Sequence, residues 1–297
     1  MMPPWIKRLT QTRAFHPAWI VLSLLAIVGV AAAIALPALY AGAKAAPPET
    51  LAPKLAAAIR QQPKRPHFSP PPDSAIPAGE FGDTIRLGRN IFTHTQIYAK
   101  QFVGNGLNCV NCHLDDGRKA DAAPLWAAYV KYPAYRAKNH KVNSYEERLA
   151  GCFRFSMNGT APAPDSKEMI ALVAYSFWLA QGAPTGADLA GGGYPKLDNP
   201  PSAPDATRGA AVFAANCAIC HGPAGQGTKV GGKYVFPPLW GKDSYNAGAG
   251  MHQVRTAAEF IRANMPLGKG DTLSLQDAWD VAQYLNSHDR PPDPRKK

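Results

Sequence analysis

The chain has 297 residues, of which 32 are lysine or arginine and 21 are aspartate or glutamate, giving a formal net charge of +11. Residues 1–66 contain eight of these basic residues and a single acid, Glu49, which leaves 24 basic residues and 20 acids for the rest of the chain. That balance argues against a nucleic-acid-binding protein, and the length leaves room for two domains.

The N-terminal segment has the pattern of a membrane anchor. Lys7, Arg8 and Arg13 precede residues 18–36, which are uncharged and almost entirely apolar. A run of this length suits a membrane-spanning helix of about 20 residues better than a signal-peptide core of about 7–15 residues. The positive residues before it predict that the N-terminus stays in the cytoplasm. An alternative is that Ala-Gly-Ala at residues 41–43 is a signal-peptide cleavage site. In either case we expect the rest of the chain on the periplasmic side, anchored or soluble.

A proline-rich segment follows at residues 44–80. It contains nine prolines, which disfavour helix and sheet and give the chain the character of an extended spacer. Such a spacer would let a soluble head reach its partners from an anchored N-terminus, so it favours the anchor over a cleaved signal.

A haem-attachment motif occurs at Cys109, Cys112 and His113, in the sequence NCVNCHL. Two thiols at this spacing can each form a thioether with a vinyl group of one porphyrin, and the adjacent histidine then lies under the iron as the proximal ligand. A zinc site would need more clustered ligands, and a thioredoxin-like C-x-x-C would not need the histidine. The motif therefore predicts a covalently bound haem c.

Two helices are predicted around this motif. The first, over residues 83–92, leads toward it. The second, over residues 166–182, has apolar residues at intervals of four, and either Asp165 or Ser166 can act as its N-cap. The aromatic and apolar residues of these helices are expected to form the core of a first domain.

Two candidate ligands for the sixth position of the first iron lie between the motif and the second helix. Cys152 is the one cysteine with no other cysteine nearby, and Met157 stands 44 residues after His113. A thiolate favours ferric iron, whereas a thioether raises the potential of a haem. Eight basic residues and three acids lie from Arg118 to Arg154, and positive charge favours a thiolate. Cys152 has two further interpretations, a small buried hydrophobic residue and an intermolecular disulfide.

The second haem motif repeats the first at Cys217, Cys220 and His221, in NCAICHG. A helix over residues 205–216 leads into it, and loops rich in glycine and proline follow, as expected for a small domain that wraps a cofactor. Two C-x-x-C-H motifs in one chain indicate a protein with two haem c groups.

Met265 is the predicted sixth ligand of the second iron. It ends a short helix, precedes Pro266 and lies 44 residues after His221. Met251 is the alternative ligand, and Met265 would then be a core residue. A terminal helix with one apolar face is predicted after Ser274, its N-cap. Helix, motif, loops, methionine and terminal helix follow one another in the order of a class I cytochrome c domain.

These patterns predict a mainly α-helical fold with two class I cytochrome c-like domains, an N-terminal transmembrane helix and a proline-rich tether. In chain order we expect a membrane anchor or signal peptide, a linker, a first cytochrome c domain, an interdomain linker, a second cytochrome c domain and a basic tail. Their predicted bounds are 1–43, 44–80, 81–182, 183–204, 205–290 and 291–297.

Four stretches resemble the dihaem thiosulfate dehydrogenases: GLNCVNCHLDDG, AYVKYPAYR, EERLAGCFRFSMNG and NMPLGKGDTLSLQDAWDVAQYL. The resemblance covers roughly residues 80–290, and its most specific part is the segment around Cys152. It implies that His113 and Cys152 ligate the first iron and that this cysteine is also the catalytic centre. It implies that His221 and Met265 ligate the second iron, which serves electron transfer.

The resemblance also implies roles for residues around the cysteine. Arg148 and Ser156 match the family's arginine four residues before and serine four residues after its cysteine, and Arg136 is a less specific match. Some members carry a lysine directly before the second methionine, able to exchange with it as a ligand. Here that residue is Asn264, so a Lys/Met exchange is not implied for this chain.

The reaction that the resemblance implies is the oxidative coupling of two thiosulfate ions into tetrathionate. Cys152 would bond to the sulfane sulfur of one thiosulfate, two electrons would leave, and a second thiosulfate would release the thiolate. Arg148 and Arg136 would hold the anions, whereas Lys138 and Lys141 are interpreted as solvated surface charges. Electrons would pass to an external acceptor, a cytochrome or a membrane oxidase. The sequence does not fix the direction, so tetrathionate reduction is also open.

An electron carrier is the alternative function, namely a membrane-tethered dihaem cytochrome with no substrate of its own. The long tether suits this role as well. A carrier gains nothing from a thiolate ligand beside a cluster of bases, and Met157 would serve it. The segment around Cys152 therefore discriminates between the two functions.

Overall fold

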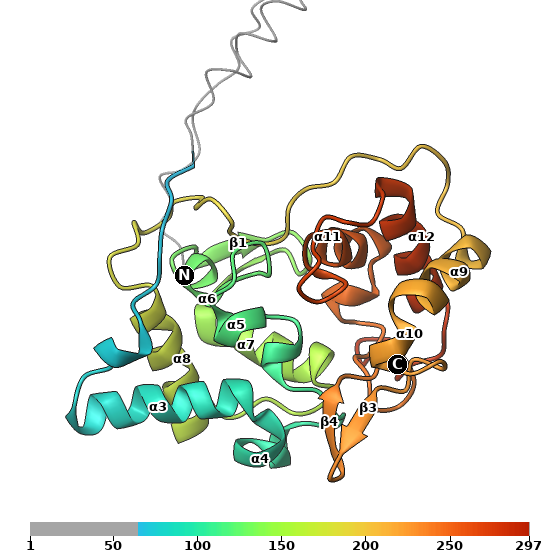
Figure 1. The fold of residues 1–297 in the computed structure, drawn as a ribbon. Coiled ribbons are helices and arrows are strands. Elements are labelled where there is room, and N and C mark those ends of the chain that lie inside the picture. Colours follow the sequence, from blue (N-terminus) through green and yellow to red (C-terminus); the bar gives the residue numbers. More distant parts are fainter. Residues whose placement is uncertain (1–64, 297) are drawn as a thin grey trace, which may run out of the picture. The chain divides into compact units, whose positions relative to one another are not determined.

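Two helix crossings organise the structure. The computed structural model describes residues 65–296. In the first domain α3 (Gly79–Thr93) packs against α8 (Lys167–Leu179), and in the second domain α9 (Ala206–Asn216) packs against α12 (Leu275–Asn286). Figure 1 shows the two pairs, one in each half of the described chain.

A glycine permits each crossing. A Cβ atom on Gly88 of α3 would overlap the carbonyl oxygen of Ala171 in α8, and a Cβ atom on Gly209 of α9 would overlap that of Asp280 in α12. In each pair the two helices therefore cross in close contact at a glycine, as expected for two domains with the same fold.

Side-chain caps begin three of the helices at the predicted places. The hydroxyl of Ser166 accepts from the backbone N–H of Met169 at 3.2 Å, and that of Ser274 accepts from the N–H of Asp277 at 3.0 Å. Asp205 caps α9 in the same way. Such caps satisfy N–H groups that have no partner inside the helix, so the starts of α8, α9 and α12 were readable from the sequence.

Short elements connect these helices. The short helices of the first domain are α4 (Thr95–Tyr98), α5 (Leu114–Gly117), α6 (Leu125–Tyr129), α7 (Tyr145–Gly151) and the π-helix η5 (Cys152–Ser156). The second domain adds α10 (Ala218–His221) and α11 (Val254–Asn264). Short 3₁₀ turns are η2 (Asp73–Ala75), η3 (Lys100–Phe102), η4 (Cys109–Asn111) and η6 (Gly250–His252).

Each domain also has one antiparallel hairpin that the sequence analysis did not predict. In the first domain β1 (Ala134–Arg136) pairs with β2 (Lys141–Asn143). In the second domain β3 (Thr228–Val230) pairs with β4 (Lys233–Phe236). The rest of the regular structure is helical, so the prediction of a mainly α fold is confirmed for the described residues.

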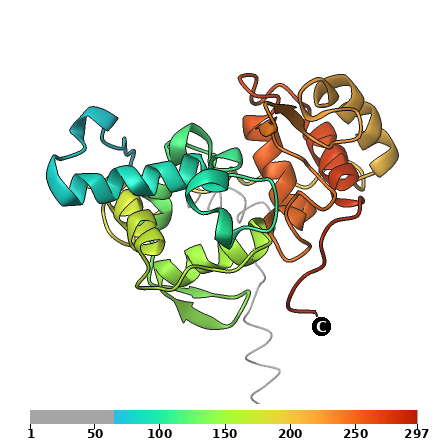
Figure 2. The same cartoon turned by 90° about the horizontal axis from the view of Figure 1, so that it is seen from below.

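Two hydrophobic cores lie behind the crossings. The first includes the fully buried Trp126 and Trp178, and the second includes Phe213 and Trp279. Met251 packs against both cores. Figure 2 shows the two halves beside each other from below, and the shared methionine indicates that they are in close contact.

Across residues 65–296, no helix combines the length and the apolar character needed to cross a membrane. The anchor predicted over residues 18–36 lies outside the described residues, as does most of the proline-rich linker.

Candidate functional site

The first predicted haem site is built on the turn η4, which begins at Cys109. Asn108 precedes the turn, and its backbone N–H donates to the side chain of Asn111 at 2.7 Å. Nδ1 of His113 lies 2.7 Å from the carbonyl oxygen of Ala123. Because a carbonyl oxygen only accepts, Nδ1 carries the proton, and Nε2 keeps the free lone pair that a metal requires.

Burial makes the cysteines of the first motif weak acids. Desolvation raises the pKa of Cys109 to about 12 and the pKa of Cys112 to about 11. Redox-active C-x-x-C motifs instead have a lowered thiol pKa. Burial also lowers the pKa of His113 to about 4, so its imidazole is neutral at pH 7. This donor set fits thioether attachment of a haem with a neutral histidine ligand, and it does not fit a thioredoxin-like site.

The second motif has the same chemistry on a different local structure. Cys217 precedes α10 and His221 ends it. Nδ1 of His221 lies 2.9 Å from the carbonyl oxygen of Pro237, which again leaves Nε2 free. Thr228 donates its hydroxyl to the carbonyl of Cys220 at 2.6 Å, and burial raises the pKa of Cys217 to about 11. Both motifs therefore fit a covalently bound haem c.

Cys152 lies at the junction of α7 and the π-helix η5. Arg148 is four residues earlier on the same face, and its Nη1 donates to Sγ of Cys152 at 2.9 Å. Charge on Cys152 is the largest cause that raises the pKa of Arg148. After burial, the same charge is among the causes that raise the pKa of Cys109 and of Cys112. The structure therefore brings the unpaired cysteine and its arginine to the first haem motif.

Met157 and Ser156 lie at the other end of η5. The backbone N–H of Met157 donates to the carbonyl of Cys152 at 2.9 Å, and its side chain is 3% exposed within the first core. The carbonyl of Ser156 accepts from Nδ2 of Asn105 at 2.8 Å. The two candidate sulfur ligands thus differ in setting, because Met157 is packed in the core whereas Cys152 is half-buried beside an arginine.

Arg136 and Lys141 lie on the hairpin of the first domain. Arg136 is exposed, and its Nη1 donates to the hydroxyl of Tyr132 at 2.8 Å. Nζ of Lys141 pairs with Glu147 at 2.6 Å, and both side chains are about half exposed. Lys141 therefore has the surface setting expected for it, and the guanidinium of Arg136 is directed toward Tyr132.

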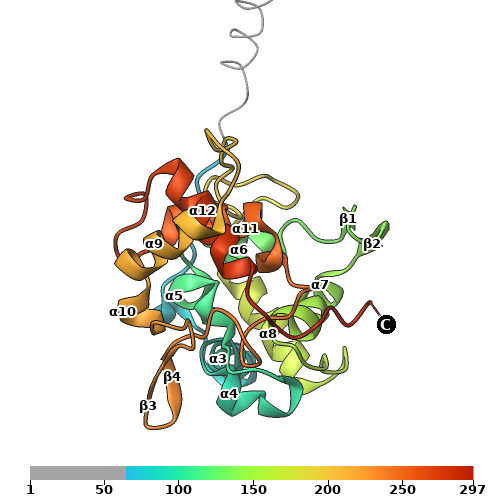
Figure 3. The ribbon, with the colours of Figure 1, turned by 90° about the vertical axis from the view of Figure 1, so that its right-hand side faces the viewer.

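Lys138 is exposed, as expected, but it also contacts the second domain. Its Nζ donates to the carbonyl of Gly248 in the second domain at 2.8 Å and lies 5.1 Å from the ring centroid of Phe155 in η5. The guanidinium of Arg295 lies 4.8 Å from the same ring, on the C-terminal segment that runs past α7 in Figure 3. Burial lowers the pKa of Lys138, and the charges of Arg295 and Arg148 lower it further. Lys138, Arg148 and Arg295 therefore lie around the π-helix, and Arg295 is paired with Asp293 at 2.6 Å.

Met265 follows α11 directly and is partly buried against the second core. The alternative ligand, Met251, packs between the two cores. Asn264 is 2% exposed, and its Nδ2 donates to the carbonyl of Asp121 in the first domain at 2.9 Å and to that of Phe260 at 3.1 Å. The residue before Met265 therefore forms a contact between the domains.

Sequence reasoning missed two tyrosines at the first haem site. Burial raises the pKa of Tyr194, and the charge of Cys112 is the next cause. Burial also raises the pKa of Tyr245, with the charge of Cys112 again among the causes. Tyr194 comes from the predicted interdomain linker, and Tyr245 comes from a loop of the second domain. Neither has a local signal, because the chain brings them to the first motif only through tertiary folding.

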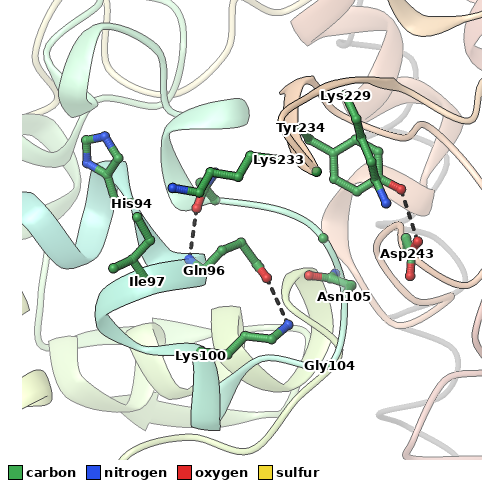
Figure 4. Close-up of a pocket in the computed structure, with 13 residues that line it drawn as sticks. His94, Gln96, Ile97, Lys100, Gly104, Asn105, Lys229, Lys233, Tyr234 and Asp243 are labelled. Carbon is green, nitrogen blue, oxygen red and sulfur yellow. Dashed lines mark hydrogen bonds between the residues drawn. The ribbon is translucent and has the colours of Figure 1, made fainter.

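A pocket of about 390 Å³ lies where the first domain meets the β3–β4 hairpin (Figure 4). In it Lys100 donates to Gln96 at 3.0 Å, and the hydroxyl of Tyr234 donates to Asp243 at 3.0 Å. None of the predicted site residues lines this pocket, so it is separate from the Cys152 site. Its lining residues are His94, Gln96, Ile97, Lys100, Gly104, Asn105, Gly106, Asn108, Lys229, Gly232, Lys233, Tyr234 and Asp243.

Two protein families match the described chain. Residues 94–185 match the SoxA/TsdA cytochrome c domain, and residues 204–285 match a family described as cytochrome c oxidase, cbb3-type, subunit III. Each matched segment contains one of the two C-x-x-C-H motifs.

Curated relatives are similar over most of the chain. The thiosulfate dehydrogenase of Stutzerimonas stutzeri is 59% identical, over 77% of this chain and 75% of the relative. That of Thiomonas intermedia is 53% identical, over 91% and 84%, and that of Allochromatium vinosum is 42% identical, over 74% and 83%.

A solved structure is also similar, the thiosulfate dehydrogenase TsdBA from Marichromatium purpuratum. It is 52% identical and superposes with a TM-score of 0.75. The match covers 78% of this chain and 51% of that one, so the chain spans about half the length of the solved protein.

Proposed function

The chain belongs to the thiosulfate dehydrogenases, oxidoreductases with covalently bound haem c, and we propose that it couples two thiosulfate ions into tetrathionate at Cys152. The observation that carries this proposal is the 2.9 Å contact between Nη1 of Arg148 and Sγ of Cys152, beside the first C-x-x-C-H motif. A sulfur atom held by a guanidinium at this place is suited to forming bonds with another sulfur. An electron carrier would have no use for it.

We propose His113 and Cys152 as the ligands of the first iron, and His221 and Met265 as those of the second. Both histidines have Nδ1 engaged by a backbone carbonyl, which leaves Nε2 for the metal. When bound, the two haems supply two one-electron acceptors and a metal site for each ligand pair. Two such acceptors in one chain match a two-electron oxidation.

Charge is the main obstacle that the protein must overcome, because two thiosulfate dianions repel each other. Two unit charges 4 Å apart interact by about 1 kcal/mol in bulk water and by about 4 kcal/mol at an effective dielectric constant of about 20, and two dianions repel several-fold more. Arg148, Lys138 and Arg136 supply positive charge around the π-helix. We propose that these cations, with the hydroxyl of Ser156, hold the substrates.

The chemistry balances in two steps. The thiolate of Cys152 bonds to the sulfane sulfur of the first thiosulfate, and formation of this S–S bond releases two electrons to the two acceptors. The sulfane sulfur of a second thiosulfate then attacks the sulfane sulfur of the first. This forms the central bond of tetrathionate and expels the thiolate of Cys152. Covalent catalysis of this kind replaces a direct encounter of two dianions by two easier steps, and Arg148 stabilises the thiolate before and after them.

The test is the variant Cys152→Gly in the haem-loaded protein. We expect both haems to stay attached, as shown by the intact mass and the haem absorbance, and thiosulfate oxidation with an artificial acceptor to fall to background. Thiosulfate should also no longer reduce the haems. Full turnover in this variant would refute Cys152 as the nucleophile. If thiosulfate does not reduce the haems of the wild type, the protein is an electron carrier instead.

We further propose that the protein works on the periplasmic face of the inner membrane and passes its electrons to an external acceptor, a cytochrome or a membrane oxidase. The support is the uncharged segment at residues 18–36, after three basic residues, and the proline-rich spacer at residues 44–80. We expect the mature protein to keep its N-terminus and to stay with membranes through an alkaline carbonate wash. A mature N-terminus beginning after residue 43 contradicts the anchor.

A further inference from the structure

The π-helix that begins at Cys152 is held by hydrogen bonds from outside itself. Its own ladder supplies the first partner, because the N–H of Met157 donates to the carbonyl of Cys152 at 2.9 Å. The carbonyl of Phe153 then accepts from the N–H of Gly159 at 2.9 Å. The next three carbonyls, at residues 154–156, form the last turn of η5, where a helix has no partners of its own to offer.

Asn246 of the second domain donates hydrogen bonds to two of these three carbonyls. Its Nδ2 donates to the carbonyl of Arg154 at 2.9 Å, and its backbone N–H donates to that of Phe155 at 3.2 Å. The same Nδ2 donates to Oδ1 of Asn158 at 3.0 Å, and Oδ1 of Asn246 accepts from the N–H of Gly248 at 3.0 Å. The side chain of Asn246 is fully buried, and it forms hydrogen bonds through both its donor and its acceptor.

Asn105 completes the arrangement from the first domain. Its Nδ2 donates to the carbonyl of Ser156 at 2.8 Å and to the carbonyl of Ser244 at 3.1 Å. Residues 244–246 of the second domain therefore lie directly against the end of η5. Single-turn π-helices often occur at functional sites, and here the turn that carries the cysteine depends on the other domain for its backbone partners.

We propose that Asn246 is a positioning residue for Cys152, through which the second domain sets the geometry of the thiolate in the first. This inference rests on the proposed role of Cys152. In that role the Cys152 sulfur must bond in turn to different partners, while its backbone returns each time to the same place beside Arg148. Because the carbonyls of Arg154 and Phe155 are fixed by Asn246, the turn can hold that place while the side chain moves.

The direct test compares Asn246→Asp with the wild type, both as full-length haem-loaded protein. The aspartate keeps the shape of the side chain and the acceptor for the N–H of Gly248. It cannot donate to the carbonyl of Arg154 or to Oδ1 of Asn158, and its carboxylate oxygen repels that carbonyl. We expect the electron paramagnetic resonance signal of the thiolate-ligated haem to become heterogeneous. We also expect faster hydrogen–deuterium exchange at the Met157 amide. Because small misplacements of reacting groups cost up to about 100-fold, we expect kcat to fall about 10- to 100-fold with little change in KM.

Gln276→Ala is the matched control. This amide in α12 also makes several hydrogen bonds, accepting from the backbone N–H and the hydroxyl of Ser202 and donating to Asp280, all within the second half of the chain. We expect its resonance signal, its exchange at Met157 and its kcat to match the wild type. Equal loss in this control would mean that Asn246 acts only through general stability and would overturn the proposal.

A second variant decides the question if Asn246→Asp does not load both haems. A Cβ atom on Gly248 would lie 2.8 Å from Cδ1 of Phe155 and 2.7 Å from Oδ1 of Asp293, so Gly248→Ala presses on η5 while it leaves the side chain of Asn246 unchanged. We expect the same change in the resonance signal. The inference is refuted if a variant that loads haem, either Asn246→Asp or Gly248→Ala, has the resonance signal and the kcat of the wild type while Cys152→Gly is inactive. If Cys152→Gly is active, the proposed function itself fails.

Discussion

Arg148→Gln is the substitution that most directly tests the chemistry of the site. In the native protein Nη1 of Arg148 donates to Sγ of Cys152 at 2.9 Å. A hydrogen bond to a charged group contributes about 1.5–3 kcal/mol, and about 1.4 kcal/mol corresponds to a tenfold change in rate. If the arginine stabilises the thiolate as it is expelled by the second thiosulfate, its loss should lower kcat/KM about 10- to 150-fold.

The assay is the initial rate of thiosulfate oxidation with an artificial electron acceptor, at several thiosulfate concentrations. Arg148→Lys should fall between the wild type and the glutamine variant, because an ammonium keeps the charge but lacks the planar fork of donors. Arg86→Gln is the control, since Arg86 is an exposed residue of α3 that pairs with Asp83, and surface pairs contribute little. If Arg148→Gln keeps kcat/KM within about twofold, the contact with Cys152 has no part in the reaction.

Three further predictions concern charge, packing and the second sulfur. Lys138→Gln should raise KM for thiosulfate about two- to fivefold. Because burial lowers the pKa of Lys138, its positive charge should be lost at a lower pH than that of an ordinary lysine, and the lower KM of the wild type should disappear there. A pH series of KM for both proteins checks this. Gly209→Ala should destabilise the second domain by about 1–3 kcal/mol, since its Cβ would overlap α12, whereas Gly250→Ala, with open space at the Cβ, should unfold near the wild-type temperature in a thermal scan. Met157→Leu should keep the thiolate resonance and a kcat within about threefold of the wild type, because a similar volume fills the same core position; loss of the resonance would make Met157 part of the metal site.

The parts of the molecule that could be predicted from the sequence are those set by neighbours along the chain. Ser166 and Ser274 act within three residues of themselves, so the starts of α8 and α12 were readable. The start of α3 was placed at residue 83, whereas the helix begins at Gly79. Ala78 has no side chain that could cap it, so no residue type marks this boundary.

The same distinction separates the site residues that were found from those that were missed. Arg148 was expected at the site only because of the resemblance, and the structure places it one helical turn before Cys152, in contact with its sulfur. Asn246 meets Arg154 across 92 positions of the chain, and nothing in its own surroundings indicates a role in the first domain. Lys138 is exposed as expected, but its hydrogen bond to Gly248 was not predicted for the same reason, because Gly248 belongs to the second domain. Interactions of this kind depend on how the two domains pack, which no local pattern specifies.

The π-helix also accounts for the division of work between the two sulfur atoms of this segment. Cys152 and Met157 are the ends of one π-turn, joined by the hydrogen bond from the N–H of Met157 to the carbonyl of Cys152. Withdrawing a fully buried methionine from a core costs about 1.5–3 kcal/mol, and Met157 is 3% exposed. Cys152 is half-buried and contacts an arginine, so its side chain can turn toward a substrate without opening the core. In the proposed mechanism the reacting sulfur is therefore the one whose movement leaves the packing intact, while the buried methionine keeps the turn in place.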